Sequence, residues 1–263
     1  FCFSNNSMTL AIDIGNTNIV IALYKNEAWT NTFRYETKEV QPPFFYETAL
    51  RNILLEWGVA YSEVNNTVIS SVVPDLNDVI TDAVRYVTGY EPLRISPDVM
   101  KNLDMPVPRP YEIGSDLVSN AYAVVKKYKT DAVIVDFGTA LTFTVVTREG
   151  GIRGVTIAPG LKTAIGSLSD NTALLPTVPL DMPVSAIGQD TITAIQSGVM
   201  WGYVGLVKEL VSRIRMEMQT DLKVVATGGL SSVLEPLSTV FDITDKMLTL
   251  EGMRLISVYT GKK

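Results

Sequence analysis

Short apolar runs on either side of tight polar turns form a pattern that occurs twice along the chain. Each copy has one β-prone run, a turn that begins with Asp and contains Gly and Thr, and a second β-prone run. The copies consist of Leu10–Ile12, Asp13-Ile-Gly-Asn-Thr17 and Ile19–Tyr24, and of Ala132–Val135, Asp136-Phe-Gly-Thr139 and Leu141–Thr147. Apolar runs of this kind, joined by glycine turns, predict a strand, a turn and a second strand in both places.

Helical periodicity predicts several helices around these strands. The segments with apolar residues at helical spacing are Tyr46–Trp57, Leu76–Val87 closed by Gly89, Ser115–Lys129 and Gln189–Arg215. Val68–Val73 and Val224–Gly229 are expected to be strands, the second of which runs into a glycine turn. Gly150-Gly151 predicts a hairpin, and Ile157–Gly160 predicts a strand that opens into a helix. Strands that alternate with helices indicate an α/β fold.

The longest predicted helix carries glycines at Gly198, Gly202 and Gly205. Glycine at these positions permits the close approach of a second helix. Packing inside one subunit and a dimer interface explain the three glycines equally well at this point.

Composition places the chain among globular proteins with a substantial core, since 46% of its 263 residues are hydrophobic and 19% are charged. The duplicated pattern favours two domains, expected at residues 8–112 and 113–263. A net charge of −6 argues against a nucleic-acid partner, because such proteins concentrate Lys and Arg. Polar residues or prolines interrupt every long apolar stretch, so we expect no membrane-spanning segment.

The numbers of cysteine and histidine residues limit the kinds of catalytic and metal sites that this chain can form. The single cysteine, Cys2, lies in a polar prefix of residues 1–7 before Met8, which we expect to be foreign to the fold and not a signal peptide. Without a cysteine pair, a reducing cytoplasm is the expected compartment. The absence of histidine excludes Ser-His-Asp and Cys-His nucleophilic sites and His-ligated zinc.

The two Asp-Gly-Thr turns suggest a duplicated nucleotide site. A glycine turn brings backbone N–H groups close to a phosphate, and Asn and Thr side chains add short donors. The leading Asp of such a turn can hold a hydrated Mg²⁺ beside the phosphate oxygens. We interpret the turn at Gly228-Gly229 as a surface against which an adenine or ribose could lie.

The order of motifs along the chain resembles that of the type III pantothenate kinases, a branch of the actin, sugar-kinase and Hsp70 superfamily. The matching stretches are Asp13-Ile-Gly-Asn-Thr-Asn18, Ser70-Ser-Val-Val-Pro74, Gly114-Ser-Asp116, Asn120-Ala121, Asp136-Phe-Gly-Thr139, Ile157-Ala-Pro-Gly160, Thr172-Ala-Leu-Leu-Pro176, Ser197-Gly198 and Thr227-Gly-Gly229.

This resemblance implies two ribonuclease-H-like domains of the actin-like ATPase superfamily, assembled as a homodimer. It implies transfer of the γ-phosphoryl group of ATP to the hydroxyl of pantothenate, the first step of coenzyme A synthesis. It also implies Mg²⁺ and a monovalent cation, K⁺ or NH₄⁺, as cofactors.

By resemblance, each functional position has an expected role. Asp116 would be the general base, Asp13 would place Mg²⁺, and Asp136 would bind the monovalent cation. The ATP site would comprise Asp13, Ile14, Gly15, Asn16, Thr17, Asn18, Ile19, Val20, Thr139 and Gly228. The pantothenate site would comprise Gly114, Ser115, Asp116, Leu117 and Thr191.

Structural explanations compete with these roles. Asp116 could cap the helix that starts near Leu117, because Asp is a favoured N-cap residue. Asp13 and Asp136 could be turn residues that bond their own backbones. Thr191 could cap the long helix or face solvent, and Gly228 could belong to an ordinary turn. If Asp116 precedes the helix, the helix dipole and free N–H groups would favour its ionised form.

Two positions beside the expected acceptor site depart from the family pattern. Leu117 stands where the family usually has an arginine, and Val107 stands near an expected substrate-contacting tyrosine. Arg109 and Lys162 are candidate replacements for the missing arginine. These departures leave open a kinase of the same architecture with another hydroxylated acceptor, or a catalytically silent ATP-binding dimeric regulator.

Overall fold

The computed structural model describes residues 8–170 and 175–261. The expected prefix at residues 1–7 lies outside this part of the chain, as do the first residues of the motif Thr172–Pro176. Contacts between residues divide the chain into two compact units. Among the described residues, unit 1 contains 8–126 and 249–261, and unit 2 contains 127–170 and 175–248. The domain boundary between residues 112 and 113 stays a prediction.

Unit 1 is built on a five-stranded mixed sheet with the order β3-β2-β1-β4-β5. Its strands are β1 (Met8–Ile14), β2 (Asn18–Lys25), β3 (Ala28–Glu36), β4 (Val64–Ser71) and β5 (Leu93–Arg94). The first three strands form an antiparallel meander, whereas β4 pairs with β1 in parallel and β5 pairs with β4 in parallel.

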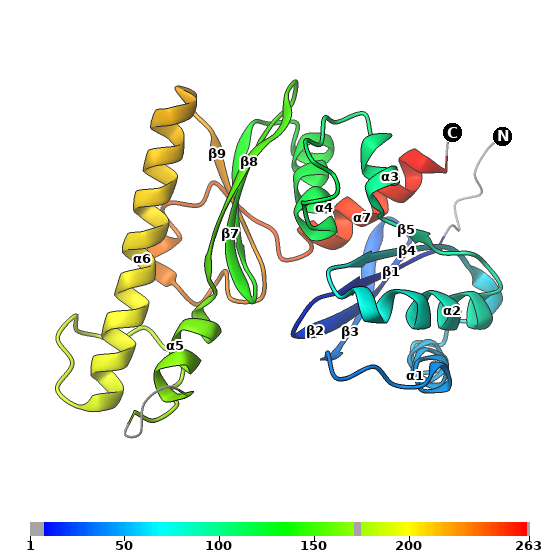
Figure 1. The fold of residues 1–263 in the computed structure, drawn as a ribbon, viewed down its shortest axis with the longest axis horizontal. Coiled ribbons are helices and arrows are strands. Elements are labelled where there is room, and N and C mark those ends of the chain that lie inside the picture. Colours follow the sequence, from blue (N-terminus) through cyan, green and yellow to red (C-terminus); the bar gives the residue numbers. More distant parts are fainter. Residues whose placement is uncertain (1–7, 171–174, 262–263) are drawn as a thin grey trace. The chain divides into compact units, whose positions relative to one another are not determined.

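Unit 2 repeats this topology (Figure 1). Its strands are β6 (Ala132–Phe137), β7 (Ala140–Thr147), β8 (Gly151–Pro159), β9 (Lys223–Thr227) and β10 (Ile243–Thr244). β6, β7 and β8 form the antiparallel meander, and β9 and β10 continue the sheet in parallel on the other side of β6. The duplicated α/β architecture predicted from the two Asp-Gly-Thr turns is therefore confirmed.

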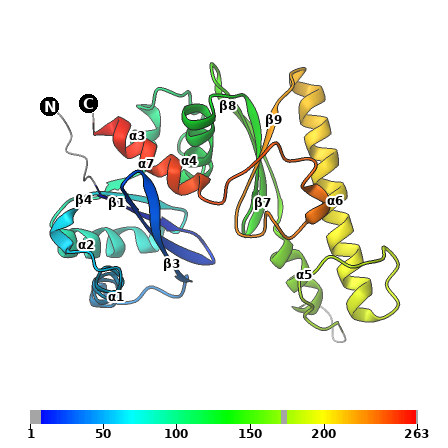
Figure 2. The same cartoon turned by 180° about the vertical axis from the view of Figure 1, so that it is seen from behind.

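Helices of unit 1 enclose the sheet from two sides. α1 (Pro43–Glu56) and α2 (Asn77–Thr88) lie side by side and bury Leu10, Ile12 and Ile14 of β1 in one core. α4 (Ser115–Ala123) and α7 (Leu248–Thr260) also lie side by side in both ribbon views (Figures 1 and 2). The remaining helix, α3 (Pro97–Lys101), is one short turn.

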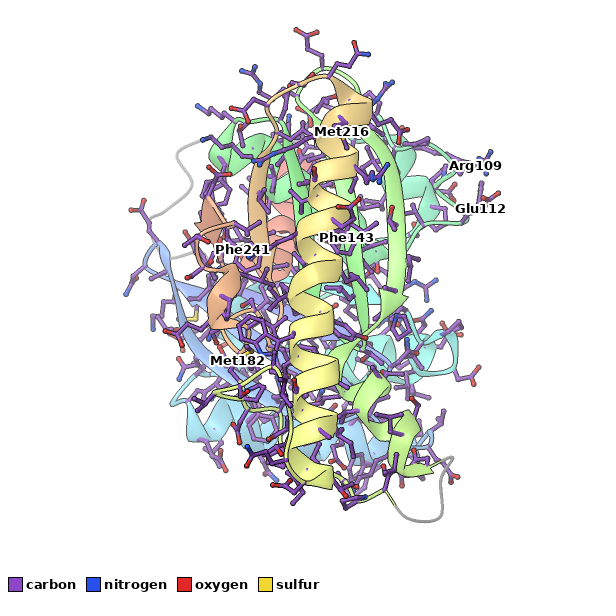
Figure 3. The ribbon with its side chains drawn as sticks, turned by 90° about the vertical axis from the view of Figure 1, so that its left-hand side faces the viewer. Arg109, Glu112, Phe143, Met182, Met216 and Phe241 are labelled. Carbon is purple, nitrogen blue, oxygen red and sulfur yellow. The ribbon has the colours of Figure 1, made fainter. Side chains whose placement is uncertain are left out.

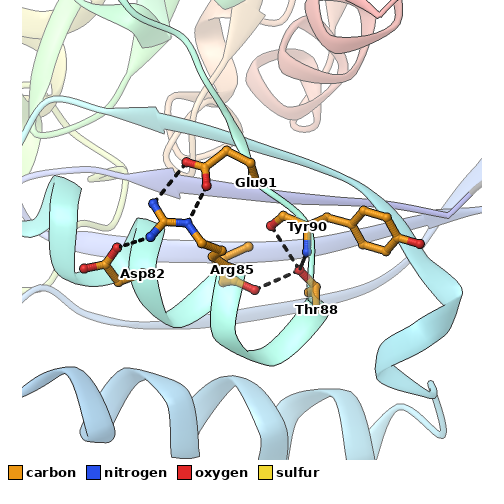
Figure 4. Close-up of polar contacts among 6 residues, drawn as sticks. Asp82, Arg85, Thr88, Tyr90 and Glu91 are labelled. Atoms are coloured by element: carbon orange, nitrogen blue, oxygen red, sulfur yellow. Dashed lines mark hydrogen bonds and ion pairs between the residues drawn. The ribbon is translucent and has the colours of Figure 1, made fainter.

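Helix α2 ends in a network of polar contacts at its last turn (Figure 4). Gly89 caps the helix in the left-handed conformation, with φ +77°, as the sequence predicts. Arg85 contacts Asp82 and Glu91, and the Thr88 hydroxyl donates to the Val84 carbonyl at 2.8 Å. The ion pairs are exposed, so they contribute little to the stability of the fold.

Unit 2 has one long helix packed along its sheet. α6 (Thr191–Met218) covers β7, and the fully buried Phe143 lies behind it, as Figure 3 shows. The shorter α5 (Leu161–Asp170) follows β8 and contacts α6. Asp190 is the N-cap of α6, because its Oδ1 accepts the N–H of Thr193 at 2.9 Å.

The three glycines of α6 have no close neighbours among the described residues outside their own stretch of helix. A Cβ atom added at Gly198, Gly202 or Gly205 would meet no atom of the described residues within 4 Å. The interpretation of these glycines as packing positions inside one subunit is therefore wrong.

Most predicted elements are confirmed, with one distortion. The helix predicted over Ser115–Lys129 is α-helical only through Ala123, and Val124–Tyr128 continue as a π-helical segment. Lys129 then ends it with φ +52°. Strands β3, β5 and β10 and helices α3 and α7 are additional elements.

Candidate functional site

The first Asp turn lies at the end of β1. Asp13 stands opposite Val20 of β2 and Ser70 of β4, so it occupies the middle of the sheet edge. The N–H of Gly15 donates to the Asn18 carbonyl at 2.9 Å, and the hydroxyl of Thr37 donates to the Gly15 carbonyl at 2.6 Å. Hydrogen bonds of both the N–H and the carbonyl of Gly15 therefore fix the turn. Asn16 and Thr17 at its tip are exposed and can meet a ligand.

The hydrophobic side chains at this turn are part of the hydrophobic core. Ile14 and Ile19 are fully buried among the core residues of unit 1. Their side chains therefore cannot contact a nucleotide, and only their backbone groups are available for such contacts. Gly15 and Asn18 are partly buried, and the side chain of Val20 is also only partly covered.

A serine cluster joins the end of β4 to the start of α4. The Ser115 hydroxyl lies 3.0 Å from the Ser70 hydroxyl, and it accepts the N–H of Ser71 at 3.0 Å. Since Ser70 is the register neighbour of Asp13, the first turn of α4 is fixed beside the first Asp turn. Asp116 is the second residue of that helix.

Asp116 is not the helix cap. Gly114 is the N-cap residue, and Oδ1 of Asp116 accepts the N–H of Leu117 at 2.9 Å. The capping explanation is therefore wrong in position, although the carboxylate does accept one N–H group of the first turn. A Cβ on Gly114 would collide with the Asp116 carboxylate, so glycine leaves the room that this carboxylate occupies.

Burial raises the pKa of the Asp116 carboxyl above its ordinary range, and the N–H groups of Leu117 and Asp116 oppose part of that rise. The helix terminus alone favours the ionised form. Desolvation outweighs this effect here, because the carboxylate is partly withdrawn from water. A carboxyl group with a raised pKa is a better proton acceptor than an ordinary aspartate.

The positions that depart from the family pattern lie in unit 1. Leu117 is only 8% exposed, and its side chain is part of the interior of the unit. Val107 is partly buried in the segment between α3 and α4. Arg109 is exposed and lies 3.4 Å from Glu112 at the surface, as Figure 3 shows. Lys162 is exposed on the first turn of α5 in unit 2.

The second Asp turn has the same place in the sheet of unit 2. Asp136 stands opposite Thr142 of β7 and Thr227 of β9. The Thr139 carbonyl accepts the N–H of Gly160 at 3.0 Å and the hydroxyl of Thr163 at 2.9 Å. The turn is therefore held by Gly160, directly before α5, and by Thr163 in the first turn of that helix.

Two positions that lie against this turn are glycine, and a side chain would not fit at either of them. A Cβ on Gly228, which has φ +89°, would lie 2.5 Å from Oδ1 of Asp136. A Cβ on Gly160 would lie 2.5 Å from the Gly138 carbonyl oxygen. Atoms do not approach this closely without displacement, so glycine at both positions leaves the turn open.

Two side chains at the second turn offer oxygen atoms that could hold a cation. The hydroxyl oxygen of Thr142 is buried and has no hydrogen-bond partner among the described residues. Residues paired across neighbouring strands share one face of the sheet, so this hydroxyl and the Asp136 carboxylate lie on the same face. A carboxylate beside an unpaired hydroxyl oxygen supplies the oxygen ligands that hard cations prefer.

The first turn fits the Mg²⁺ that accompanies ATP. Within residues 8–170 and 175–261, no group of three or more His, Cys, Asp or Glu side chains could enclose a metal ion. Mg²⁺ bound to a nucleotide needs no such cage, because it keeps several waters and uses one or two carboxylates with the phosphates. Asp13 beside a glycine turn supplies such a carboxylate.

Thr191 lies apart from both turns along the chain. It is the first residue of α6 and is exposed, whereas Asp190 caps the helix. The capping explanation for Thr191 is therefore wrong, and the solvent-facing explanation fits. Two further threonines lie at the turns, and the motifs do not mark them. Thr37 donates to the Gly15 carbonyl, and Thr142 stands opposite Asp136.

None of the helices within the described ranges is both long and apolar enough to cross a lipid bilayer.

Solved structures share the fold of this chain at low sequence identity. A protein described as a Baf family transcriptional activator from Campylobacter jejuni matches 97% of this chain and 100% of its own, with a TM-score of 0.60 and 20% identity. Component A of (R)-2-hydroxyglutaryl-CoA dehydratase from Acidaminococcus fermentans covers 96% and 97%, with a TM-score of 0.54 and 13% identity. Such neighbours have the actin-like ATPase fold, which confirms the predicted fold class.

Sequence comparisons identify the family. The family profile of the type III pantothenate kinases matches residues 9–213. The type III pantothenate kinase of Geotalea uraniireducens is 35% identical over 249 residues, which cover 95% of this chain and 97% of that protein. The relative from Geobacter sulfurreducens is 36% identical over 95% of this chain and 98% of its own length. The chain belongs to the type III pantothenate kinase family.

Proposed function

We propose that this protein is an ATP-dependent kinase that phosphorylates the hydroxyl of pantothenate to give 4′-phosphopantothenate, the first step of coenzyme A synthesis. The single observation that carries the proposal is the placement of Asp116. A partly buried carboxylate with a raised pKa lies on a helix turn that hydrogen bonds fix beside the first Asp turn. Phosphoryl transfer needs such positioning and charge neutralisation more than covalent help.

The first Asp turn is proposed to hold the phosphates of ATP. Backbone N–H groups between Asp13 and Val20, with the exposed Asn16 and Thr17, would donate to phosphate oxygens. Asp13 would hold Mg²⁺, which neutralises charge on the phosphates when it is bound. Thr139 in the second turn would add a phosphate contact, and Gly228 would lie along the adenosine.

Asp116 is proposed to act as the general base. Its carboxylate accepts the proton of the pantothenate hydroxyl while the hydroxyl oxygen forms a bond to the γ-phosphorus. The bond between that phosphorus and the bridging oxygen breaks, and ADP leaves with the electron pair. Gly114, Ser115, Leu117 and Thr191 are proposed to contact the acceptor. Since the Leu117 side chain is buried, its contact would come from the backbone.

A monovalent cation, K⁺ or NH₄⁺, is proposed to bind at Asp136. The unpaired hydroxyl of Thr142 on the same sheet face supports this role. Replacing K⁺ by a large organic cation in the assay is expected to lower kcat. A rate that does not depend on the monovalent cation would contradict the proposed site. A reducing cytoplasm is the proposed compartment, because the chain has one cysteine.

ADP release by the purified chain tests the function. With Mg-ATP and K⁺, we expect ADP to form only when pantothenate is added, and we expect one phosphoryl group to be transferred for each ADP. A panel of other hydroxylated acceptors is the comparison, because Leu117 and Val107 depart from the family pattern. Preference for another acceptor would replace pantothenate in the proposal. ATP binding without turnover on any acceptor would indicate the silent regulator.

A homodimer is proposed to form through the first half of α6. Residues 191–207 contain no charged side chain, even on the face of the helix that is exposed. That exposed face includes Gly198, Gly202 and Gly205. Trp201 on that face is 37% exposed. This exposed face is uncharged, carries an aromatic residue and has glycine at three positions. Such a face is typical of a surface that packs against a helix of another subunit.

Introducing a charge on this face is expected to dissociate the dimer. Gly202→Lys should shift the protein to the monomer in sedimentation velocity, because an unpaired ammonium group would be buried at the interface. Ser212→Lys is the matched control on the exposed, charged second half of α6, and it should leave the dimer intact. A dimer that persists in Gly202→Lys would show that α6 is not the interface.

A further inference from the structure

Helix α7 is held between two parts of unit 1. On one side it contacts the β2–β3 hairpin through Glu251 and Arg254. Trp29 Nε1 donates to the Glu251 carboxylate at 3.2 Å, and Arg254 donates to both oxygens of that carboxylate at 3.0 and 2.7 Å. The Arg254 guanidinium also lies 4.3 Å from the centre of the Tyr24 ring. The hairpin therefore fixes the first half of α7.

On its other side α7 touches the backbone of α4. A Cβ atom on Gly252 would lie 2.9 Å from Cα of Ser119, and closer still to its carbonyl carbon and oxygen. Ser119 is fully buried, so the two helices are in backbone contact at this point. One residue further along α4, Asn120 Oδ1 accepts the hydroxyl of Thr249 at 2.8 Å.

The contacted part of α4 is one turn from the proposed base. The Ser119 hydroxyl donates to the Ser115 carbonyl at 2.7 Å, and Ser115 in turn is bonded to Ser70 and Ser71 at the end of β4. These hydrogen bonds join the part of α4 that α7 contacts to the turn that carries Asp116. A displacement of α4 at Ser119 would therefore reach that turn.

We propose that α7 positions the reaction's base, with Gly252 as the positioning residue that sets the distance between α7 and α4 and hence the place of Asp116. The inference rests on the proposed role of Asp116. Ordinary contact of a Cβ atom begins at 3.4 Å, whereas the Ser119 carbonyl oxygen would lie 1.8 Å from a Cβ at residue 252, so any side chain there would push the helices apart by about 1 Å or more. A displacement of about 1 Å can lower a catalysed rate by about 10²-fold.

The test is a comparison of Gly252→Ala with Gly166→Ala, a helical position in α5 where the nearest atom to an added Cβ is 3.9 Å away. We expect kcat for acceptor phosphorylation to fall by about 10- to 100-fold in Gly252→Ala and to be unchanged in Gly166→Ala. The stoichiometry of ATP binding by calorimetry, and the KM for ATP, should stay unchanged. A merely structural defect would instead lower the bound stoichiometry in proportion to kcat.

Substitution of Thr249 is a second test with a smaller structural change. It tests whether α7 positions Asp116 even if Gly252→Ala does not fold. Thr249→Val removes the hydroxyl that contacts Asn120 and should lower kcat about threefold to tenfold, since one hydrogen bond is lost. Thr249→Ser keeps the hydroxyl and should restore the rate. Native kcat in folded Gly252→Ala, or in Thr249→Val, would overturn the inference. Asp116→Asn assayed alongside separates this failure from a failure of the proposed base, because an active Asp116→Asn would overturn the base itself.

Discussion

Replacement of Asp116 by asparagine is expected to lower kcat for acceptor phosphorylation by about 10²- to 10⁴-fold, because a general base contributes a rate factor of that size. Asparagine has nearly the same shape and still accepts the N–H of Leu117, so the first turn of α4 should stay in place. ATP binding should be unaffected. The measurement is kcat at saturating pantothenate, with ATP affinity from calorimetry.

The same substitution is expected to leave stability unchanged or to raise it near neutral pH. Burial gives Asp116 a higher pKa in the folded than in the unfolded protein. The folded state therefore binds more protons between the two pKa values, and the free energy of unfolding falls as the pH rises through that window. Asparagine carries no charge and removes this loss. A melting temperature that falls together with kcat would identify Asp116 as a structural residue.

Asp98→Asn is a matched control for this experiment. Asp98 is also the second residue of a helix in unit 1, but its side chain is exposed and 3.6 Å from Lys101. Its replacement should leave kcat within about twofold of the original, because a surface ion pair contributes little. Equal losses in the two variants would contradict a catalytic role for Asp116.

Gly160→Ala is expected to lower kcat/KM for ATP by about 10²-fold, because it displaces the second Asp turn by a large fraction of an ångström. The added methyl would lie 2.8 Å from the Thr139 carbonyl carbon and 2.5 Å from the Gly138 oxygen. The turn cannot retreat freely, since its carbonyl is bonded to Gly160 and Thr163. Overpacking of this kind also destabilises a fold by about 1–3 kcal/mol.

Gly154→Ala on strand β8 separates the two effects. A Cβ at Gly154 meets no atom within 4 Å, and the residue is exposed on the strand that leads to Gly160. This variant should keep both the melting temperature and kcat/KM for ATP. If Gly160→Ala keeps native kinetics despite a lower melting temperature, the second turn does not contact the nucleotide.

Local patterns predicted the elements that have strong local signals. Each Asp turn is flanked by buried strands whose apolar residues face the core, and Gly89 ends α2 with the positive φ that glycine favours. Strand β3 was missed because it is an edge strand, and most of its residues are exposed and polar. Its pairing depends on β2 and not on its own pattern. Helix α7 was missed because its partners lie far away in the sequence.

The motifs mark only part of the candidate site. The motifs indicated Asp13, Asp116 and Asp136, and the sheet places Asp13 and Asp136 at equivalent positions. The burial that raises the pKa of Asp116 could not be predicted, because it depends on the packing of α4 against distant segments. The unpaired hydroxyl of Thr142 likewise needs the strand register and the burial of a single atom.

The place of α7 in unit 1 has a consequence for how the protein is made. Trp29 and Glu251 are 222 residues apart in sequence, yet both belong to the same compact unit. Domains that emerge first from the ribosome usually fold first. Unit 1 cannot do so completely, because the helix that covers α4 and the β2–β3 hairpin is synthesised only after all of unit 2. Until then the Gly252 contact surface of α4 has no partner from α7, so unit 1 is the first unit to begin synthesis and the last to be completed.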